Sequence, residues 1–340
     1  MSSTSRATQV AVITHEHDLH AYAVRRDLAR RHGIACRIVE ADRLNRGTGM
    51  IWAGGGSPEL DGPAGFAPAA SVPDCDGESV PVADLAAVWF RRLNCPKKAD
   101  YPGVTEAAHL DLIRNDSRDA LLGTMQARFT GTWVDRPEAS RTAENKVRQL
   151  QAAAGAGLAV PRTLVSNDPS TIRAFCAGLD GRVIIKPVRG TGMAPMITAK
   201  VTPELLANDA SLRLSPAIYQ ELIPGSRHIR AHVFGEHDAA ALLESGDLDW
   251  RPNLGIPATA HTLPAETLAA MRRLLDALEL SMGVFDLKLT ATGYVFLEVN
   301  PQGQFLFIEG MCGLPLTAMM ADFLAEAALV RGPAAGAPRP

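Results

Sequence analysis

The sequence predicts an α/β protein, and three observations support this fold class. Close to the N-terminus, an apolar run at 10–14, an amphipathic helical pattern at 18–31 and a second apolar run at 34–40 follow one another. This β-α-β order implies two parallel strands joined by a right-handed crossover. Close to the C-terminus, two β-rich runs at 283–290 and 294–300 are separated by a short loop and predict an antiparallel hairpin. Strand and helix patterns alternate between these regions, which is typical of an α/β chain.

Length and composition limit the class of protein. The 340 residues are enough for two or three domains with their own cores. A net charge of −3 argues against a general nucleic-acid binder. No run reaches the roughly 18 apolar residues of a membrane span, and no hydrophobic signal region precedes the first strand. The five cysteines are scattered without CxxC spacing and indicate reduced thiols. We therefore expect a cytoplasmic protein without nucleic-acid or membrane partners, and leave homo-oligomerisation open.

The N-terminal region is predicted to be a β-α-β domain that does not bind a dinucleotide. No GxGxxG pattern follows the first strand, and the triple glycine Gly54–Gly56 lies in a segment with the composition of turns. The run Val88–Arg92 predicts a strand that ends in two arginines, and a helical pattern at 105–129 closes the domain. Arg91 and Arg92 are candidates for binding carboxylates, because guanidinium groups pair with them bidentately. The alternative is a structural ion pair on the surface or between domains.

The C-terminal hairpin carries a pattern that points to chemistry. A three-residue loop at 291–293 predicts a register in which Asp286 lies opposite Glu298 and Lys288 lies opposite Phe296. Side chains alternate across a strand, so Asp286, Lys288, Glu298 and Asn300 share one face. The opposite face is predicted to be apolar and to carry Phe285, Leu287, Leu289, Val295, Leu297 and Val299.

Two carboxylates directly opposite each other repel unless a cation lies between them. Oxygen ligands without histidine or cysteine suit Mg²⁺, which keeps several waters and binds substrate phosphates through one or two carboxylates. The hairpin pattern therefore predicts a magnesium site on the face of Asp286 and Glu298. The alternative is a solvated hairpin face whose carboxylates point into water.

A second candidate segment follows the predicted strand Val183–Lys186. A lysine at the end of an apolar strand is costly to bury unless an anion meets it. The segment continues with Arg189, Gly190 and Gly192, and glycines two residues apart let backbone N–H groups approach phosphate oxygens. It is not a P-loop, because the GxxxxGK[ST] pattern is absent. We interpret it as an anion-binding segment.

Two other stretches place polar residues next to predicted strands. A helix within 136–158 holds Lys146 near its start, and an apolar strand is predicted at 217–223. The following run at 228–233 alternates, which puts His228, Arg230 and His232 on one face. Alternation alone explains the two histidines, so they are interpreted as incidental polar residues.

The pattern D-x-K-x(9)-E-V-N-P-x-G-Q at 286–304 resembles the metal-binding end of the ATP-grasp fold. The continuation NPQGQFLFIE, together with VWFRR, DWR and the stretch from Asn145-Lys146 to Pro169, resembles the graspetide (microviridin-type) maturases, ATP-grasp ligases that macrocyclise ribosomal peptides. The likeness covers most of residues 88–325. It implies an ATP-grasp fold with an N-terminal βαβ pre-ATP-grasp domain at 1–129, subdomains at 130–223 (with the glycine-rich lid) and 224–330 (with the metal site), and a disordered tail at 331–340.

The resemblance also implies roles for single residues. Two Mg²⁺ ions on the phosphates of ATP would be held by Asp286, Glu298 and Asn300. The nucleotide would be bound by Lys146, Lys186, Arg189, Gly190 and Gly192, with Glu221, Leu222 and Ile223 as the hinge along the adenine edge. Catalytic roles next to the γ-phosphate fall to Arg230, Arg251 and Lys288. The peptide substrate would meet Arg91 and Arg92.

Three functions are compatible with these patterns. The first is a ligase that activates Asp or Glu side chains of a ribosomal precursor, which has a leader and an acidic core, as acyl phosphates and joins them to Ser, Thr or Lys side chains. The second is an ATP-grasp ligase that adds an amino acid to a small acid or to a protein terminus, like the RimK and glutathione synthetase enzymes. The third is a nucleotide-binding regulator without turnover. Phosphoryl transfer requires mainly positioning and charge neutralisation, which the lysines, arginines and metal ligands supply. This inventory favours the first two, and the likeness of NPQGQFLFIE, DWR, VWFRR and the stretch from Asn145-Lys146 to Pro169 to the graspetide maturases favours the first of these.

Overall fold

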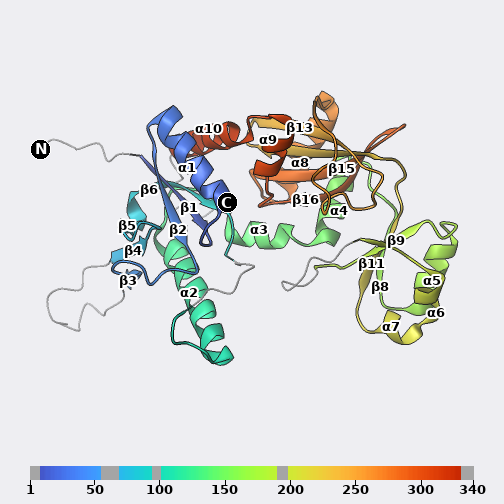
Figure 1. Ribbon diagram of the computed structural model, residues 1–340, viewed down its shortest axis with the longest axis horizontal. Helices are drawn as coiled ribbons and strands as arrows, with labels where there is room; N and C mark the ends of the chain where they lie inside the picture. Colours follow the sequence, from blue (N-terminus) through green and yellow to red (C-terminus); the bar gives the residue numbers. More distant parts are fainter. Residues whose placement is uncertain (1–7, 55–68, 94–100, 190–197, 331–340) are drawn as a thin grey trace, which may run out of the picture. The chain divides into compact units, whose positions relative to one another are not determined.

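A computed structural model of the chain describes residues 8–54, 69–93, 101–189 and 198–330. Gly190, Gly192 and the predicted tail at 331–340 lie outside these ranges, as does most of the triple-glycine turn. The chain divides into two compact units, Met1–Arg136 with Thr317–Pro340, and Pro137–Leu316 (Figure 1). No helix in the described ranges is both long enough and apolar enough to cross a membrane.

The N-terminal unit contains the predicted β-α-β opening. Strand β1 (Gln9–Thr14) is followed by α1 (Leu19–His32) and by β2 (Ala35–Glu40), which pairs with β1 in parallel. Strands β6 (Leu85–Phe90) and β7 (Thr132–Val134) extend the sheet on the other side in the order β2-β1-β6-β7, again in parallel. The switch from β2 on one side of β1 to β6 on the other follows the doubly wound pattern.

Smaller elements complete this unit. Three short strands form a second, antiparallel sheet, and its members are β3 (Ile51–Ala53), β4 (Ala69–Pro73) and β5 (Ser79–Pro81). A 3-10 turn at Val82–Asp84 and the long helix α2 (Ala107–Arg128) pack with them around an apolar core.

The last helix, α10 (Leu316–Leu329), is grouped with the N-terminal unit, whereas the sequence placed it at the end of the C-terminal subdomain. A link to α1 accounts for this, because Arg31 and His32 both contact the carboxylate of Asp322 at 2.8 and 2.7 Å. The other predicted domain borders stay predictions.

The second unit begins with two helices, α3 (Pro137–Ala143) and α4 (Lys146–Gly155), and a four-stranded antiparallel sheet. The sheet has the order β10-β9-β11-β8, with β8 at Thr163–Ser166, β9 at Val183–Lys186, β10 at Ala199–Lys200 and β11 at Ala217–Glu221. Its apolar side chains pack with three helices, which are α5 (Pro169–Ala177), α6 (Pro203–Ala207) and α7 (Asp209–Arg213).

A five-stranded antiparallel sheet follows in the order β14-β13-β12-β15-β16. Its strands are β12 (Arg227–Phe234), β13 (His237–Glu244), β14 (Ala258–His261), β15 (Met282–Thr290) and β16 (Gly293–Asn300). Helix α8 (Ala265–Ala277) packs on the hairpin in one core with α4, and α9 (Leu306–Cys312) follows the last strand (Figure 1).

This sheet is strongly curved. His261 on β14 and Tyr294 on β16 belong to the two outer strands, yet their Nε2 and Oη atoms lie 2.8 Å apart. In a flat sheet, outer strands of this kind would be separated by about 19 Å, since neighbouring strands lie roughly 4.8 Å apart. The curvature gives the sheet a concave side.

The hairpin register differs from the prediction at the turn. Thr290 pairs with Gly293 and not with Tyr294, so the loop has two residues and Lys288 lies opposite Val295 instead of Phe296. A β-bulge then inserts one extra residue into β16. The bulge restores the predicted pairing further along, where Asp286 lies opposite Glu298.

The bulge also changes which side chains reach the core. Phe296 is fully buried beside Phe285 and Val299, whereas Val295 and Leu297 are only partly buried. The predicted apolar face was therefore wrong at these two positions. Simple alternation fails because the extra residue reverses the order of the faces on either side of it.

Candidate active site

Asp286, one of the proposed metal ligands, pairs with a buried arginine on the neighbouring strand. Asp286 on β15 is the Cα partner of Arg230 on β12, and Arg230 Nη1 donates to both carboxylate oxygens at 2.9 and 2.8 Å. Its Nη2 donates to the carbonyl of Gln304 at 3.2 Å. Asn300 donates a weak hydrogen bond of 3.4 Å to Asp286. Burial raises the pKa of Asp286, with the Arg230 charge opposing and the facing charge of Glu298 adding to the rise.

Glu298 is ionised by its surroundings. Its carboxylate lies 3.2 Å from Lys146 Nζ and 3.8 Å from Arg251 Nη1. Burial favours the neutral acid, but the charges of Lys146, Arg251 and Lys186 outweigh it and lower the pKa of Glu298 to about 2. The carboxylate is therefore available as a charged oxygen ligand at neutral pH.

Lys146 owes its position to a helix cap. The Asn145 side chain accepts hydrogen bonds from the backbone N–H groups of Val147 and Arg148 at 3.0 and 3.3 Å, so α4 begins at Lys146. A cation in the first turn opposes the helix dipole. The nearby Glu298 offsets this cost, and a phosphate would do the same.

Lys186 ends the buried strand β9, as predicted, and is 8% exposed. Burial and the charge of Lys146 lower its pKa to about 8, while the charge of Glu298 opposes the shift. The lysine is thus a desolvated cation close to two others. An incoming polyanion would relieve this repulsion.

Lys288 has a buried partner in His228, which strand alternation alone had indicated to be an incidental polar residue. Its Nζ lies 2.9 Å from His228 Nε2, and both side chains are buried on the face that carries Asp286 and Arg230. Burial lowers the pKa of Lys288, and burial together with the lysine charge lowers the pKa of His228 to about 4. Neutral His228 therefore accepts from the lysine. Pairing of two strands far apart in sequence creates this contact, which one-strand alternation cannot reveal.

Arg251 is held by its own motif. It donates to both carboxylate oxygens of Asp249 at 2.8 and 2.5 Å, and its side chain stays half exposed. Between them in sequence, Trp250 is buried and its ring lies 6.1 Å from that of Phe307 on α9. Phe307 also lies 5.8 Å from the Arg230 guanidinium, within cation–π range. The two motifs DWR and FLFIE therefore support each other next to the hairpin.

The remaining nucleotide-binding candidates within the described residues are Arg189 and the three predicted hinge residues. Arg189 forms an exposed ion pair of 3.3 Å with Glu144. Glu221 pairs with Arg162 at 3.0 Å, and its backbone N–H donates to the Arg162 carbonyl. The N–H of Leu222 likewise donates to the Arg182 carbonyl, and Ile223 follows directly. The predicted roles of Glu221, Leu222 and Ile223 at the adenine, and of Arg189, Gly190 and Gly192 at the phosphates, stay predictions.

Arg91 and Arg92 lie in the N-terminal unit directly after β6. Arg91 is 1% exposed, and its Nε donates to Asp18 at 2.6 Å. Asp18 also accepts from the Thr14 hydroxyl and caps α1. Arg91 thus has an internal carboxylate partner, in a buried ion pair within the N-terminal unit and not in a surface or interdomain pair. Peptide binding by either arginine remains a prediction.

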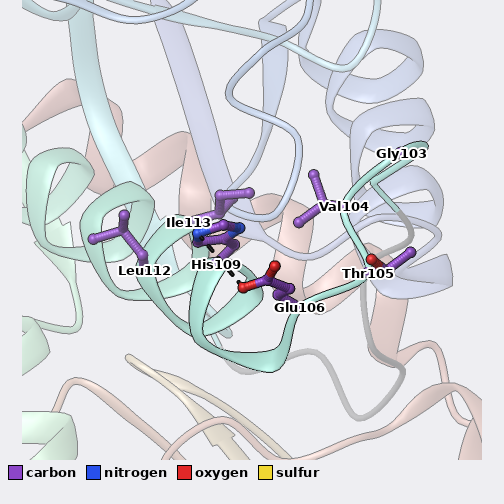
Figure 2. Close-up of a pocket in the computed structure, with 7 residues that line it drawn as sticks. All are labelled: Gly103, Val104, Thr105, Glu106, His109, Leu112 and Ile113. Atoms are coloured by element: carbon purple, nitrogen blue, oxygen red, sulfur yellow. Dashed lines mark ion pairs between the residues drawn. The ribbon is translucent and has the colours of Figure 1, made fainter.

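Figure 2 shows a surface pocket at the start of α2 in the same unit, with a volume of about 400 Å³. It is lined by residues between Gly103 and Ile113, including an exposed ion pair of 4.0 Å between Glu106 and His109. None of the predicted site residues lines it. We assign it no chemistry.

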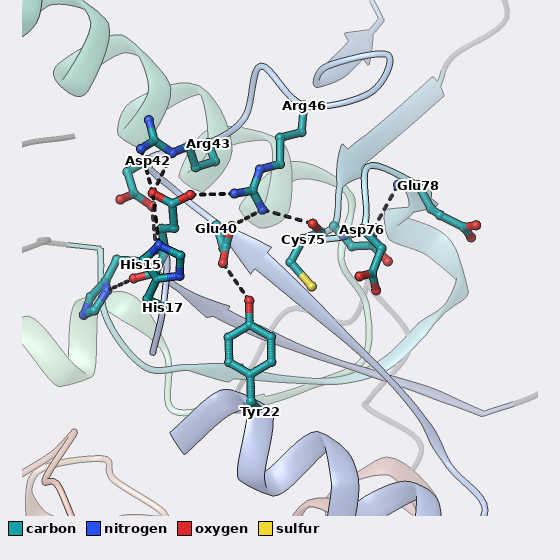
Figure 3. Close-up of polar contacts among 12 residues, drawn as sticks. His15, His17, Tyr22, Glu40, Asp42, Arg43, Arg46, Cys75, Asp76 and Glu78 are labelled. Atoms are coloured by element: carbon teal, nitrogen blue, oxygen red, sulfur yellow. Dashed lines mark hydrogen bonds and ion pairs between the residues drawn. The ribbon is translucent and has the colours of Figure 1, made fainter. Parts of the chain in front are cut away.

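Charged side chains also gather at the carboxyl ends of β1 and β2 (Figure 3). Glu16 contacts Arg43 and Arg46, each at 2.6 Å, and Arg46 also pairs with Glu40. Tyr22 donates to Glu40 at 3.2 Å. Ligands of open α/β sheets often bind at this edge, but here the carboxylates are neutralised by internal partners.

The donor set on the hairpin fits magnesium. Within the described ranges, no three His, Cys, Asp or Glu residues gather closely enough to hold a metal alone. Two carboxylates and one amide on adjacent strands match an ion that keeps waters and takes phosphate oxygens as further ligands. Asp286 is buried with a raised pKa beside Glu298, so a cation there would favour its ionised form.

The chain was compared with family models, curated proteins and solved structures. No family model matches the chain. Among curated proteins, a probable alpha-L-glutamate ligase of Mannheimia succiniciproducens is 28% identical over 199 residues, covering 56% of this chain and 66% of the relative. One from Xanthomonas campestris pv. campestris is 27% identical over 212 residues, covering 59% of this chain and 72% of the relative. The chain thus spans about two thirds of these relatives.

Solved structures match over nearly the whole chain. The macrocyclase MdnC bound with precursor peptide MdnA, from Microcystis aeruginosa MRC, has a TM-score of 0.79 at 24% identity, covering 93% of this chain and 99% of that one. The macrocyclase MdnB from the same organism has a TM-score of 0.72 at 25% identity with the same coverage. The ATP-grasp ligase PsnB, complexed with minimal precursor, Mg and ADP, has a TM-score of 0.72 at 25% identity, covering 96% and 99%. The chain is therefore an ATP-grasp ligase, and it resembles the ATP-grasp enzymes that macrocyclise ribosomal peptides.

Proposed function

We propose that this ligase activates Asp or Glu side chains of a ribosomal precursor peptide as acyl phosphates and closes them into macrocyclic esters or amides. The observation that carries the proposal is the meeting of Glu298 with Lys146, Arg251 and Lys186 beside the Asp286–Arg230 pair. Such a cluster of cations around two carboxylates suits the binding of ATP phosphates and Mg²⁺. Peptide-bound neighbours support a peptide as the second substrate.

The chemistry balances with ATP and two side chains. A carboxylate oxygen attacks the γ-phosphorus of ATP, and ADP leaves. A hydroxyl or amine then attacks the acyl carbon, loses its proton and displaces phosphate. Each bond formed removes the elements of one water from the peptide. Phosphoryl transfer of this kind requires in-line positioning and neutralised charge more than covalent participation by the protein.

One group of residues would bind the nucleotide and its metal ions. Asp286, Glu298 and Asn300 would hold two Mg²⁺ ions, whose charge neutralises the phosphate oxygens. Lys146 and Lys186 would bind phosphate oxygens, with Arg189, Gly190 and Gly192 closing over them. Glu221, Leu222 and Ile223 would line the adenine.

The acyl-transfer side would be served by three cations. Arg251 is half exposed and can turn from Asp249 towards a substrate carboxylate, whereas Arg230 is buried and fixed by Asp286. Lys288, held by His228, would donate to an oxygen of the acyl phosphate. Arg91 and Arg92 are proposed to meet the peptide. The leader would dock away from the nucleotide and raise the local concentration of the acidic core.

One alternative has an observation in its favour. The curated relatives bear the name of alpha-L-glutamate ligases, which suits an enzyme that adds an amino acid to another molecule. Their alignments cover little more than half of this chain, whereas the macrocyclases match 93% or more of it. We therefore place the peptide crosslinking function first.

Product mass separates the two functions. The chain would be incubated with ATP, Mg²⁺ and an acidic precursor encoded beside its gene, with Glu298→Ala as the inactive control. Crosslinking predicts a loss of about 18 mass units per bond, since each bond forms with loss of one water. A product heavier by one amino-acid residue would support the alternative and overturn the proposal.

A further inference from the structure

The backbone between two proposed metal ligands is held by a buried side chain. Val299 lies between Glu298 and Asn300 on β16, which is the outer strand of its sheet. Its N–H donates to Gln149 Oε1 at 3.1 Å, and its carbonyl accepts from Gln149 Nε2 at 2.8 Å. One side-chain amide therefore makes the pair of hydrogen bonds that a neighbouring strand would make.

The same amide makes a third bond. Gln149 Nε2 also donates to the carbonyl of Ala143, the last residue of α3, at 2.7 Å. Gln149 is 4% exposed, so these three bonds form away from water. Buried donors and acceptors are costly to leave unmade. The amide thus joins the end of α3, the helix α4 and the outer strand at one point.

Helix geometry links this point to the nucleotide site. Lys146 precedes Gln149 by three residues on α4, so both side chains lie on one face of the helix. Lys146 contacts the Glu298 carboxylate, and Gln149 contacts the backbone of the next residue. The contacts of Lys146 with Glu298 and of Gln149 with Val299 together fix the rotation of α4 about its axis and its position along β16.

We propose that Gln149 is a positioning residue for the metal site, acting through Val299 on Glu298 and Asn300. The proposal rests on the proposed function of these two residues. Ligands two apart on a strand point to the same side, so a shift of the residue between them moves both. Groups that orient metal ligands without touching the metal commonly change metal affinity by about ten- to a hundredfold.

The test uses Gln149→Met, which keeps the length of the side chain and removes its hydrogen bonds. Mn²⁺ binding to the full chain in the presence of ADP would be followed by electron paramagnetic resonance, which reports free Mn²⁺ without any turnover. We expect Mn²⁺ affinity at least about tenfold weaker than in the wild type. We also expect faster hydrogen exchange at the Val299 amide, and a higher Mg²⁺ requirement for turnover with kcat nearly restored at saturating Mg²⁺.

Leu278→Ala is the matched control. Leu278 is buried in the same core, and its apolar side chain cannot form hydrogen bonds with the site. It should lower the melting temperature and leave Mn²⁺ affinity unchanged. Should Gln149→Met fail to fold, Gln149→Glu takes its place, since it keeps the acceptor for the Val299 N–H and loses the two donated bonds.

The outcomes separate this inference from the proposed function. Wild-type Mn²⁺ affinity in the folded Gln149 variant, with affinity lost in Glu298→Ala, would overturn the positioning role and leave the metal site standing. Wild-type affinity in both variants would instead overturn the metal site itself. Equal loss of affinity in Gln149→Met and Leu278→Ala would show that general destabilisation is the cause, and this also overturns the inference.

Discussion

Asp286 and Glu298 face each other across β15 and β16, yet their surroundings shift their pKa values in opposite directions. Burial raises the pKa of Asp286, whereas three nearby cations overcome burial and lower that of Glu298 to about 2. Two groups that interact this closely titrate as a pair. Glu298 therefore carries a firmly fixed negative charge, and a metal ion between the two carboxylates would oppose the upward shift of the Asp286 pKa.

The first prediction concerns the metal ligands. Asp286→Asn, Glu298→Ala and Asn300→Ala should each abolish ATP-dependent turnover at ordinary Mg²⁺, because the first replaces a charged ligand by a neutral amide and the other two each remove an oxygen ligand. Asparagine is chosen at Asp286 because its amide oxygen can still accept a hydrogen bond from the buried Arg230, which alanine would not provide. ADP release measures the turnover of each variant, and the melting temperature shows whether the variant is still folded. Near-wild-type turnover in any two variants would remove the metal assignment.

The second prediction follows from Lys186. Burial and the charge of Lys146 lower its pKa to about 8 in the free protein. Bound phosphate favours the charged form, so nucleotide binding between about pH 8 and 10 should be accompanied by proton uptake. Well below pH 8 the lysine is already charged, so uptake should fade as the pH falls through the pKa and vanish by about pH 6. Calorimetry in buffers of different ionisation enthalpy measures this.

The control for proton uptake is Lys186→Arg, because a guanidinium stays protonated throughout this range. Uptake that persists unchanged in the arginine variant would show that another group titrates, and Lys186 would then not contact the phosphates.

The third prediction concerns Arg251. Arg251→Ala should sharply slow crosslinking, while precursor affinity measured by anisotropy falls by no more than about tenfold, roughly 1.4 kcal/mol. Deleting the leader should do the opposite, with strongly weakened affinity and slow crosslinking at high peptide concentration. If Arg251→Ala works at the wild-type rate, its role is limited to the ion pairs with Asp249 and Glu298.

The fourth prediction tests the bulge in β16. Phe296 is fully buried and Val295 is only partly buried, the reverse of what alternation from the turn suggests. Phe296→Ala should lower the free energy of unfolding by about 3–5 kcal/mol, and Val295→Ala by less than about 1 kcal/mol. Urea unfolding of both variants gives the comparison. A larger loss in Val295→Ala would contradict the register.

These residues also show how far the sequence alone could predict the molecule. The predicted pairing of Asp286 with Glu298 is confirmed, but only because the bulge offsets the one-residue error at the turn. The bulge itself was not predictable, since alternation does not register an inserted residue. The contacts of Gln149 with Val299 and of Lys288 with His228 join segments far apart in the chain. Packing alone creates such contacts, so local patterns leave no sign of them.

The fate of one oxygen atom tests the central claim most directly. A precursor whose Asp and Glu carboxyl groups carry ¹⁸O would be incubated with the chain, ATP and Mg²⁺, and the phosphate released would be analysed by mass spectrometry. Attack of a carboxylate on the γ-phosphorus leaves that oxygen on phosphate when the acyl group is transferred. The account predicts one ¹⁸O in the phosphate for each crosslink formed. Unlabelled phosphate released together with crosslinked peptide would contradict it.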